Sequence, residues 1–248
     1  MTSTSDESKT DIKSGINQGM EVFIRRLKTE DIDQVVEIER EAFSPLWIST
    51  PFKRQLNNQY ACYLVACPDG ETAQEAQSES KPAMGRPLWD RLARRIGGLM
   101  GRSPGLEPAT EFVAGYVSVW FQGSEAHITE IAVRENLRGR GIGELLLIGS
   151  VRAAVKYGSN VMTLEARVSN FIAQRLYEKY GFKNVGTRKG YYSDNREDAV
   201  IMTTCPIDTE EYGRMFQALQ DTYTERWGEI QINDSQPETG LNSSKRAL

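Results

Sequence analysis

The stretch RGRGIG, residues 138–143, constrains the fold of this chain more than any other. It places three glycines between an apolar segment that ends at Val133 and the segment ELLLIGSVRAAV, which has helical spacing. A strand, a glycine turn and a helix in this order can bind an anion, because the first helical turn offers unpaired N–H groups and the positive end of the macrodipole. Arg138 and Arg140 would add donors for a diphosphate. The alternative is a tight turn with solvated arginines.

Two common phosphate motifs do not fit this turn. Glu144 stands where the dinucleotide fingerprint G-x-G-x-x-G needs its last glycine, and no Gly-Lys-Ser/Thr follows as in a P-loop. The spacing Arg138-x-x-Gly141-x-Gly143 instead resembles the pyrophosphate loop of the GNAT acetyltransferase superfamily, (Q/R)-x-x-G-x-(G/A). The segment NFIAQRLYEKYGF, from Asn170 to Phe182, is similar to that family's N-x-x-A-x-x-L-Y-x-x-x-G-F.

Two further segments narrow the resemblance. RKGYYSDNREDAVIM and EREAFSPLW resemble the substrate loops of bacterial ribosomal-protein alanine N-acetyltransferases, which are relatives of the eukaryotic N-terminal acetyltransferases. The likeness covers residues 22–67 and 111–204. The segment AFSPLWIST differs from the Phe-Pro-(x-Pro)-Trp-Ser pattern of those relatives. This difference leaves the preference for an acceptor open.

The segment pattern predicts one α/β domain of the GNAT fold. Apolar runs and turn signals give the order βααβββαβαββ, a mixed and mostly antiparallel sheet with helices on both faces, followed by a C-terminal helix. We expect a disordered tail over 1–20, the acetyltransferase domain over 21–204, a flexible insert over 68–110, and an added helix with a polar tail over 205–248. In the insert, LWDRLARRIGGLMGR is either a basic amphipathic helix for a membrane surface, RNA or a partner, or an element packed on its own domain.

His127 is the chain's single histidine, and this excludes several chemistries. With one histidine, neither a zinc cluster nor a Ser-His-Asp triad is expected. We therefore expect that the chain binds no metal and that carboxylates or tyrosines transfer the protons. His127 itself is expected to be a strand-edge histidine rather than a base. A net charge of −4 gives no basic field for nucleic acid, and three cysteines without metal spacing suggest a reducing compartment. With no signal peptide or membrane-length apolar run, the expected location is cytoplasmic.

The resemblance implies acetyl-CoA as the co-substrate. Main-chain groups of Ile131 and Val133 would bind its pantetheine amides where two strands separate, and Asn170 would bind the same arm. The alternative for Asn170 is an ordinary helix start. The implied cofactor-binding residues are Ile131, Ala132, Val133, Arg138, Gly139, Arg140, Gly141, Ile142, Gly143, Asn170 and Tyr177.

The resemblance also implies the catalytic pair. Glu165 matches the family's catalytic glutamate and Tyr177 its hydroxyl beside the sulfur, although Tyr177 could be a core tyrosine and Glu130 could share or assume the role of base. A terminal α-amine, with a pKa of about 8, is roughly one-tenth neutral at pH 7, whereas a lysine near 10.4 is neutral in well under a thousandth of molecules. The chemistry therefore favours an α-amine.

The acceptor would lie between two walls. By the same resemblance, Tyr191 and Tyr192 would form one wall and Phe43, Pro45 and Trp47 the other, and Glu130 is also expected to bind the substrate. The expected partner is a protein N-terminus, with a ribosomal protein starting with alanine as one case. Two alternatives are an N-acetyltransferase for small amines and a non-catalytic acyl-CoA-binding module. The sequence leaves the oligomeric state open.

Overall fold

The computed structural model describes residues 20–43, 50–69 and 111–233. Its strands are β1 (Val22–Arg26), β2 (Ala61–Pro68), β3 (Gly115–Gln122), β4 (Glu125–Val133), β5 (Val161–Arg167), β6 (Phe182–Arg188), β7 (Ala199–Thr204) and β8 (Gln231–Asn233). Its helices are α1 (Ile32–Phe43), α2 (Phe52–Gln55), α5 (Ile142–Tyr157), α6 (Phe171–Lys179) and α7 (Glu210–Trp227), with short 3-10 turns η1 (Thr29–Asp31) and η2 (Glu135–Leu137). This order confirms the predicted one as far as α7 and adds β8.

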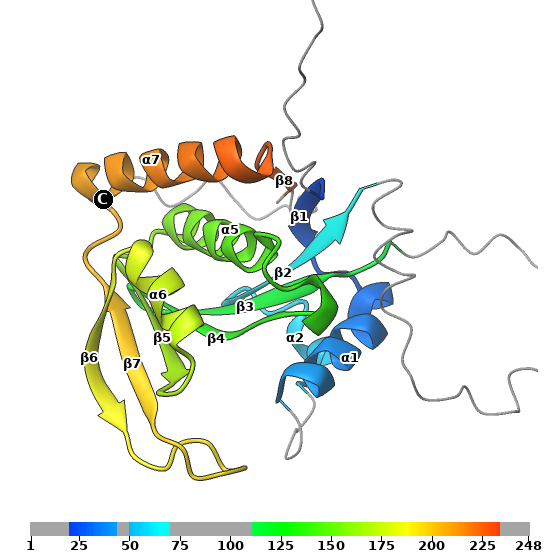
Figure 1. Cartoon of the computed structure of the whole chain (residues 1–248), viewed down its shortest axis with the longest axis horizontal. Coiled ribbons are helices and arrows are strands. Elements are labelled where there is room, and N and C mark those ends of the chain that lie inside the picture. The colour runs from blue at the N-terminus through cyan, green and yellow to red at the C-terminus, as the bar shows by residue number, and fades with distance from the viewer. Residues whose placement is uncertain (1–19, 44–49, 70–110, 234–248) are drawn as a thin grey trace, which may run out of the picture.

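The strands form one open, eight-stranded sheet in the order β6-β7-β5-β4-β3-β2-β1-β8. Neighbours pair antiparallel except β4 with β5 and β1 with β8, which are parallel. Figure 1 shows that β5, β6 and β7 turn away from the direction of β3 and β4. The sheet is therefore mixed and mostly antiparallel, as predicted.

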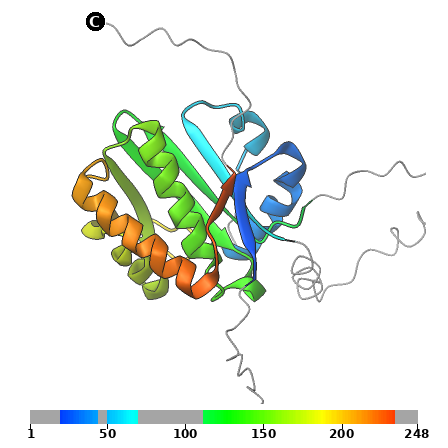
Figure 2. The same ribbon diagram turned by 90° about the horizontal axis from the view of Figure 1, so that it is seen from above.

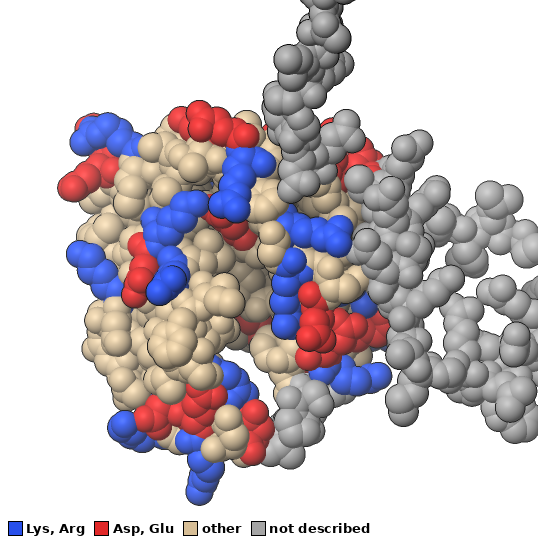
Figure 3. Space-filling view, in the orientation of Figure 1, with Lys and Arg blue, Asp and Glu red and all other residues tan. Residues whose placement is uncertain are grey.

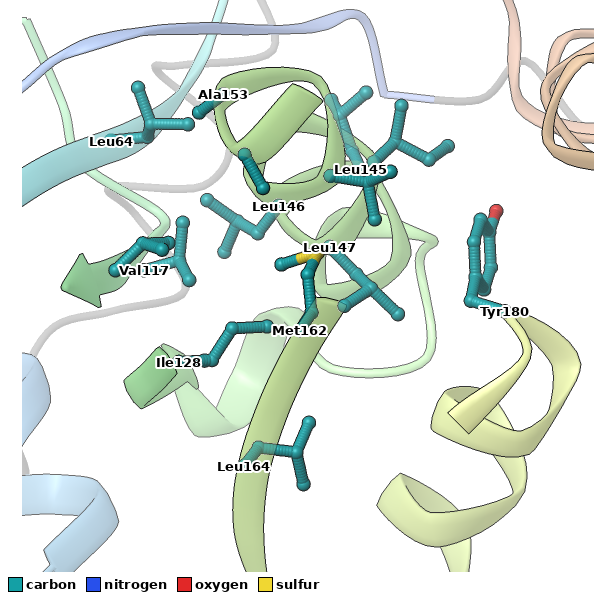
Figure 4. Packing of buried hydrophobic residues seen from close by; sticks show 14 of the residues in the cluster. Leu64, Val117, Ile128, Leu145, Leu146, Leu147, Ala153, Met162, Leu164 and Tyr180 are labelled. Carbon is teal, nitrogen blue, oxygen red and sulfur yellow. The ribbon is translucent and has the colours of Figure 1, made fainter. Parts of the chain in front are cut away.

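Helices cover both faces of the sheet (Figures 1 and 2). Helix α5 lies over one face, where Leu146 and Leu147 pack with sheet residues such as Val117 and Leu164 (Figure 4). Apolar residues lie on all sides of α5, as expected for a helix enclosed between the sheet and α7. Helices α1 and α2 cover the other face and enclose a second cluster around Ile38 and Tyr116.

The C-terminal segment is part of this core. Tyr212, Phe216 and Tyr223 of α7 are buried in the same cluster as α5. After α7 the chain turns at Gly228 and adds β8 beside β1, a strand that the sequence pattern did not predict. Three residues, only one of them apolar, are too short to give a strand signal. Most of the expected tail over 1–20 (residues 1–19) and most of the expected insert over 68–110 (residues 70–110) lie outside the described residues.

Candidate active site

The glycine turn leaves the start of α5 without a side-chain cap. Gly139 has φ 77° and Gly141 has φ 79°, a left-handed conformation that glycine adopts without strain. Gly141 is the N-cap of α5, and it has no side chain to accept from the first helical N–H groups. The first N–H groups of α5 are therefore left without a side-chain acceptor, as at helix N-termini that bind anions. Arg138, at its entrance, donates from Nε to the carbonyl of Val133 at 3.2 Å.

Strands β4 and β5 separate beside this turn. Their parallel pairing ends at Ile128 with Leu164, although β4 continues to Val133 and β5 to Arg167. A β-bulge lies at the same point, because Ser118 pairs with Glu130 and Val119 with Ile128, leaving Thr129 as the extra residue. A bulge bends and twists its strand, and this accounts for the loss of pairing. The β5-facing edge of β4 is therefore open from Thr129 to Val133.

Glu165 lies on the face of β5 that points away from α5. Its Oε2 is 3.0 Å from Nε2 of His127, its Oε1 is 3.0 Å from Nη2 of Arg188, and its side chain is only 7% exposed. His127 comes from β4, where it pairs in register with Thr163. The parallel register thus brings a histidine and a carboxylate together at the point where the strands separate.

The hydrogen bonds around His127 define where its protons lie. Oγ1 of Thr163 donates its only proton to Oε1 of Glu125 at 2.8 Å. Nδ1 of His127, 2.7 Å from the same oxygen, must therefore donate to it. Nε2 then faces the Glu165 carboxylate at 3.0 Å. Nε2 and the carboxylate oxygen are both acceptors at this contact, so the pair can take up one proton and share it.

Glu130 lies on the same face of the sheet as Glu165 but has its own partners. Its carboxylate accepts from the hydroxyls of Thr50 and Tyr116, both at 3.1 Å. Burial raises the pKa of Glu130, and the nearby charge of Glu39 raises it further. Glu130 is thus placed beside Thr50, just before the start of α2.

Tyr177 of α6 approaches from the opposite face, where it belongs to the core cluster around α5. Burial raises the pKa of Tyr177, with Tyr192 adding to the shift, so its phenol keeps its proton at neutral pH. Asn170 is the N-cap of α6, and its side-chain oxygen accepts from the N–H of Ala173 at 3.2 Å. The ordinary helix-start function of Asn170 is therefore present, whatever else it binds.

The loop between β6 and β7 is fixed by Arg167 at the end of β5. The Arg167 guanidinium pairs with Asp194 at 2.8 Å and with Glu197 at 3.0 Å, and it lies 3.9 Å from the ring centre of Tyr192. Hydrogen bonding from the Ser169 side chain is the largest of the effects that lower the pKa of Glu197 to about 2, and the bond from the Ser169 N–H comes next. The loop that carries the two tyrosines is thereby held against β5 and α6.

Two tyrosines form the surface that this loop presents. The ring centres of Tyr191 and Tyr192 are 5.2 Å apart in an edge-to-face arrangement, and Tyr191 is exposed. Charged side chains of both signs gather on the tip of this hairpin, and Lys and Arg side chains border the hollow in the middle of the same view (Figure 3). On the opposite side of the expected groove, Phe43 ends α1 and is exposed, whereas Pro45 and Trp47 lie outside the described residues.

Comparisons with known proteins identify the family. A family model described as the acetyltransferase (GNAT) family matches residues 86–182. A Bacillus subtilis protein named "Putative ribosomal protein bS18-alanine N-acetyltransferase" is 33% identical over 180 residues, which are 72% of this chain and 92% of that protein. The chain belongs to the GNAT acetyltransferase family.

Other relatives agree with this membership. An N-alpha-acetyltransferase of Sulfurisphaera tokodaii is 31% identical over 186 residues, covering 75% of this chain and 93% of that protein. The crystal structure of the ribosomal-protein-S18-alanine N-acetyltransferase of Escherichia coli has a TM-score of 0.53 and 24% identity, covering 76% of this chain and 96% of that one, and it shows the fold. This GNAT chain is therefore an N-acetyltransferase, as the motifs predicted.

The structure brings together some predicted residues and adds others. Arg188 links Glu165 to Tyr191, whose ring centre is 5.5 Å from the Arg188 guanidinium. Sequence reasoning did not assign His127, Arg167 or Arg188 to this GNAT site, because their contacts depend on strand register. Within the described ranges no group of three or more His, Cys, Asp or Glu could hold a metal ion, and no helix is long and apolar enough to span a membrane.

Proposed function

We propose that this chain transfers the acetyl group of acetyl-CoA to the α-amine of a protein N-terminus. The observation that carries the proposal is the His127–Glu165 contact at the point where β4 and β5 separate. A proton acceptor there lies near the loop between β6 and β7, because Arg188 contacts both Glu165 and Tyr191. Tyr177 approaches from the α5 face. A thioester held between the strands would thus have a base on one side and a hydroxyl on the other.

The residues present fit acetyl-CoA. The uncapped start of α5 and its two left-handed glycines suit the diphosphate, and the open edge of β4 from Thr129 to Val133 suits the amides of the pantetheine arm. Acetyl-CoA supplies the activated acyl group. Ile131 and Val133 would offer main-chain groups to the arm, and Arg138 would be available to the diphosphate once it left the Val133 carbonyl.

In the reaction, the amine nitrogen forms a bond to the acetyl carbonyl carbon, and the carbon–sulfur bond breaks. The amine's proton passes to the His127–Glu165 pair and from there to solvent, and the thiolate takes up a proton from solvent to leave as a free thiol. Tyr177, whose raised pKa keeps its phenol protonated, donates a hydrogen bond to the departing sulfur. The proton that nitrogen loses therefore balances the one that sulfur gains.

An α-amine suits this base better than a lysine does. An α-amine needs little help at neutral pH because about a tenth of it is already unprotonated, whereas lysine is almost wholly charged. Tyr191 and Tyr192 offer apolar walls and hydroxyls to the first residues of a peptide. The name of the Bacillus subtilis relative supports a ribosomal protein that begins with alanine as one acceptor.

The test is thiol release from acetyl-CoA with several acceptors. Peptides that start with Ala, Ser, Met or Gly would be compared with a blocked peptide carrying one lysine and with spermidine. We expect turnover with free N-termini only, and its loss in Glu165→Gln at unchanged acetyl-CoA affinity. Turnover with spermidine alone would assign the chain to small-amine acetyltransferases. Acetyl-CoA binding without turnover on any acceptor would favour a binding module.

A further inference from the structure

The C-terminal helix α7 places an indole directly on the glycine turn. A Cβ atom built at Gly141 would lie 2.8 Å from Cδ2 of Trp227 and 2.9 Å from its Cε2 and Cγ. Such distances are below any ordinary contact, so the ring occupies the space that a side chain at position 141 would need. Figures 1 and 2 both show the end of α7 next to the start of α5.

The segments before and after Trp227 in the sequence are both anchored to the rest of the domain. Before it, Tyr212 of α7 donates to the carbonyl of Tyr180 at 3.1 Å, and Gln220 accepts from Nε of Arg152 at 2.9 Å. After it, β8 pairs with β1, and Ile232 of β8 packs against the core cluster. The position of the indole is thus fixed by contacts that do not involve the turn.

The contact is specific to one of the two left-handed glycines. Gly139 has nearly the same φ as Gly141, but a Cβ there would meet nothing within 4 Å. Gly143, inside the first turn of α5, would meet only Val133 at 3.8 Å. The indole therefore supports the residue that caps α5 and leaves the rest of the turn accessible.

The guanidinium of Arg226 lies over the Trp227 ring. The Arg226 guanidinium lies 4.8 Å from the centre of the Trp227 ring, and Arg226 is exposed whereas Trp227 is half-buried. A guanidinium on an aromatic ring remains available to an anion, because its N–H donors lie in its own plane.

We propose that Trp227 is a positioning residue for the diphosphate of the cofactor. By packing on Gly141, the indole holds the N-cap of α5 in its left-handed conformation and so orients the N–H groups of the first helical turn. Trp227 acts through this backbone and not on the acetyl group. This inference rests on the proposed function, since it takes the turn to be the diphosphate site.

The test compares two thioesters that differ in the diphosphate. Acetyl-CoA contains it, whereas S-acetylpantetheine keeps the arm and the acetyl group without it. In Trp227→Ala we expect the Kd of acetyl-CoA to rise about tenfold, equal to about 1.4 kcal/mol, with kcat unchanged. The Kd or KM of S-acetylpantetheine should stay the same. Trp227→Phe, which keeps a flat ring, should give a smaller loss and serves if the alanine variant does not fold. Gln217→Ala, on the exposed side of the same helix, is the matched control and should change neither ligand.

Each outcome has one meaning. An equal loss for both thioesters would show general disruption of the site and overturn the inference. Unchanged or tighter acetyl-CoA binding in Trp227→Ala and Trp227→Phe would overturn it as well, tighter binding showing that the indole obstructs the site. If the wild-type chain binds no acetyl-CoA, the proposed function itself fails.

Discussion

The contact between Trp227 and Gly141 predicts unequal stability losses at two glycines with the same backbone conformation. Gly139 and Gly141 have φ of 77° and 79°, so an alanine at either position costs about 1–2 kcal/mol for its left-handed backbone. At Gly141 alone the new Cβ would also lie 2.8 Å from the indole. Forcing an extra carbon into such a packed contact adds about 1–3 kcal/mol. Gly141→Ala should therefore lose about 1–3 kcal/mol more than Gly139→Ala.

Thermal unfolding without any ligand measures this difference. For a chain of this size, 1 kcal/mol shifts Tm by about 2–4 °C, so Gly141→Ala should unfold at least about 2 °C below Gly139→Ala. The same two substitutions are then made in Trp227→Ala. There the gap between them should close, because the atoms that the Cβ meets are gone. Equal losses at the two glycines in the wild-type chain, or a gap that persists without the indole, would refute the reasoning.

Three further substitutions test the other parts of the site. Tyr177→Phe should lower kcat by about 10²–10⁴-fold, since the hydrogen bond to the departing sulfur is lost. Steady-state rates at saturating acetyl-CoA measure this loss. An unchanged kcat would show that Tyr177 is only a core tyrosine. Arg167→Ala should raise the KM of the acceptor peptide by up to about 100-fold without changing the KM of acetyl-CoA, because it releases the loop that Asp194 and Glu197 anchor. Lys183→Ala, on the exposed side of β6, is the control. Burial raises the pKa of Glu130 above 4.5. Between about pH 4.5 and the raised pKa, the folded chain keeps this proton and the unfolded chain has lost it. The contribution of this carboxyl to stability therefore falls as the pH rises through that range. In Tm measured from pH 4 to 8, Glu130→Gln should remove that part of the decline, and parallel curves for both proteins would contradict this.

The order of strands and helices could be predicted from the sequence, because each element carries its own local signal. The turn at residues 138–143 and the segment from Asn170 to Phe182 have fixed internal spacing, so the turn and α6 could be predicted without knowing how strands pair. β8 could not be predicted, because three residues gain their strand conformation only from pairing with β1. Local patterns cannot show such pairing.

The contacts of the candidate site depend on register, which the sequence does not encode locally. His127 meets Glu165 only because β4 and β5 pair in parallel with His127 beside Thr163, and a shift by one residue would turn the histidine to the other face. The alternation of buried and exposed residues in AHITEIAV places His127 on one face, but not next to a particular carboxylate. The contact of Trp227 with Gly141 spans 86 positions and depends on how α7 crosses α5.

The site of acetylation tests the central claim most directly. A peptide with a free N-terminal alanine and one internal lysine, incubated with acetyl-CoA and the full chain, would be analysed by tandem mass spectrometry to locate the added acetyl group. The account predicts that the acetyl group lies on the α-nitrogen of alanine and that the lysine stays unmodified. Acetylation of the lysine, or of neither amine while spermidine is acetylated, would contradict it.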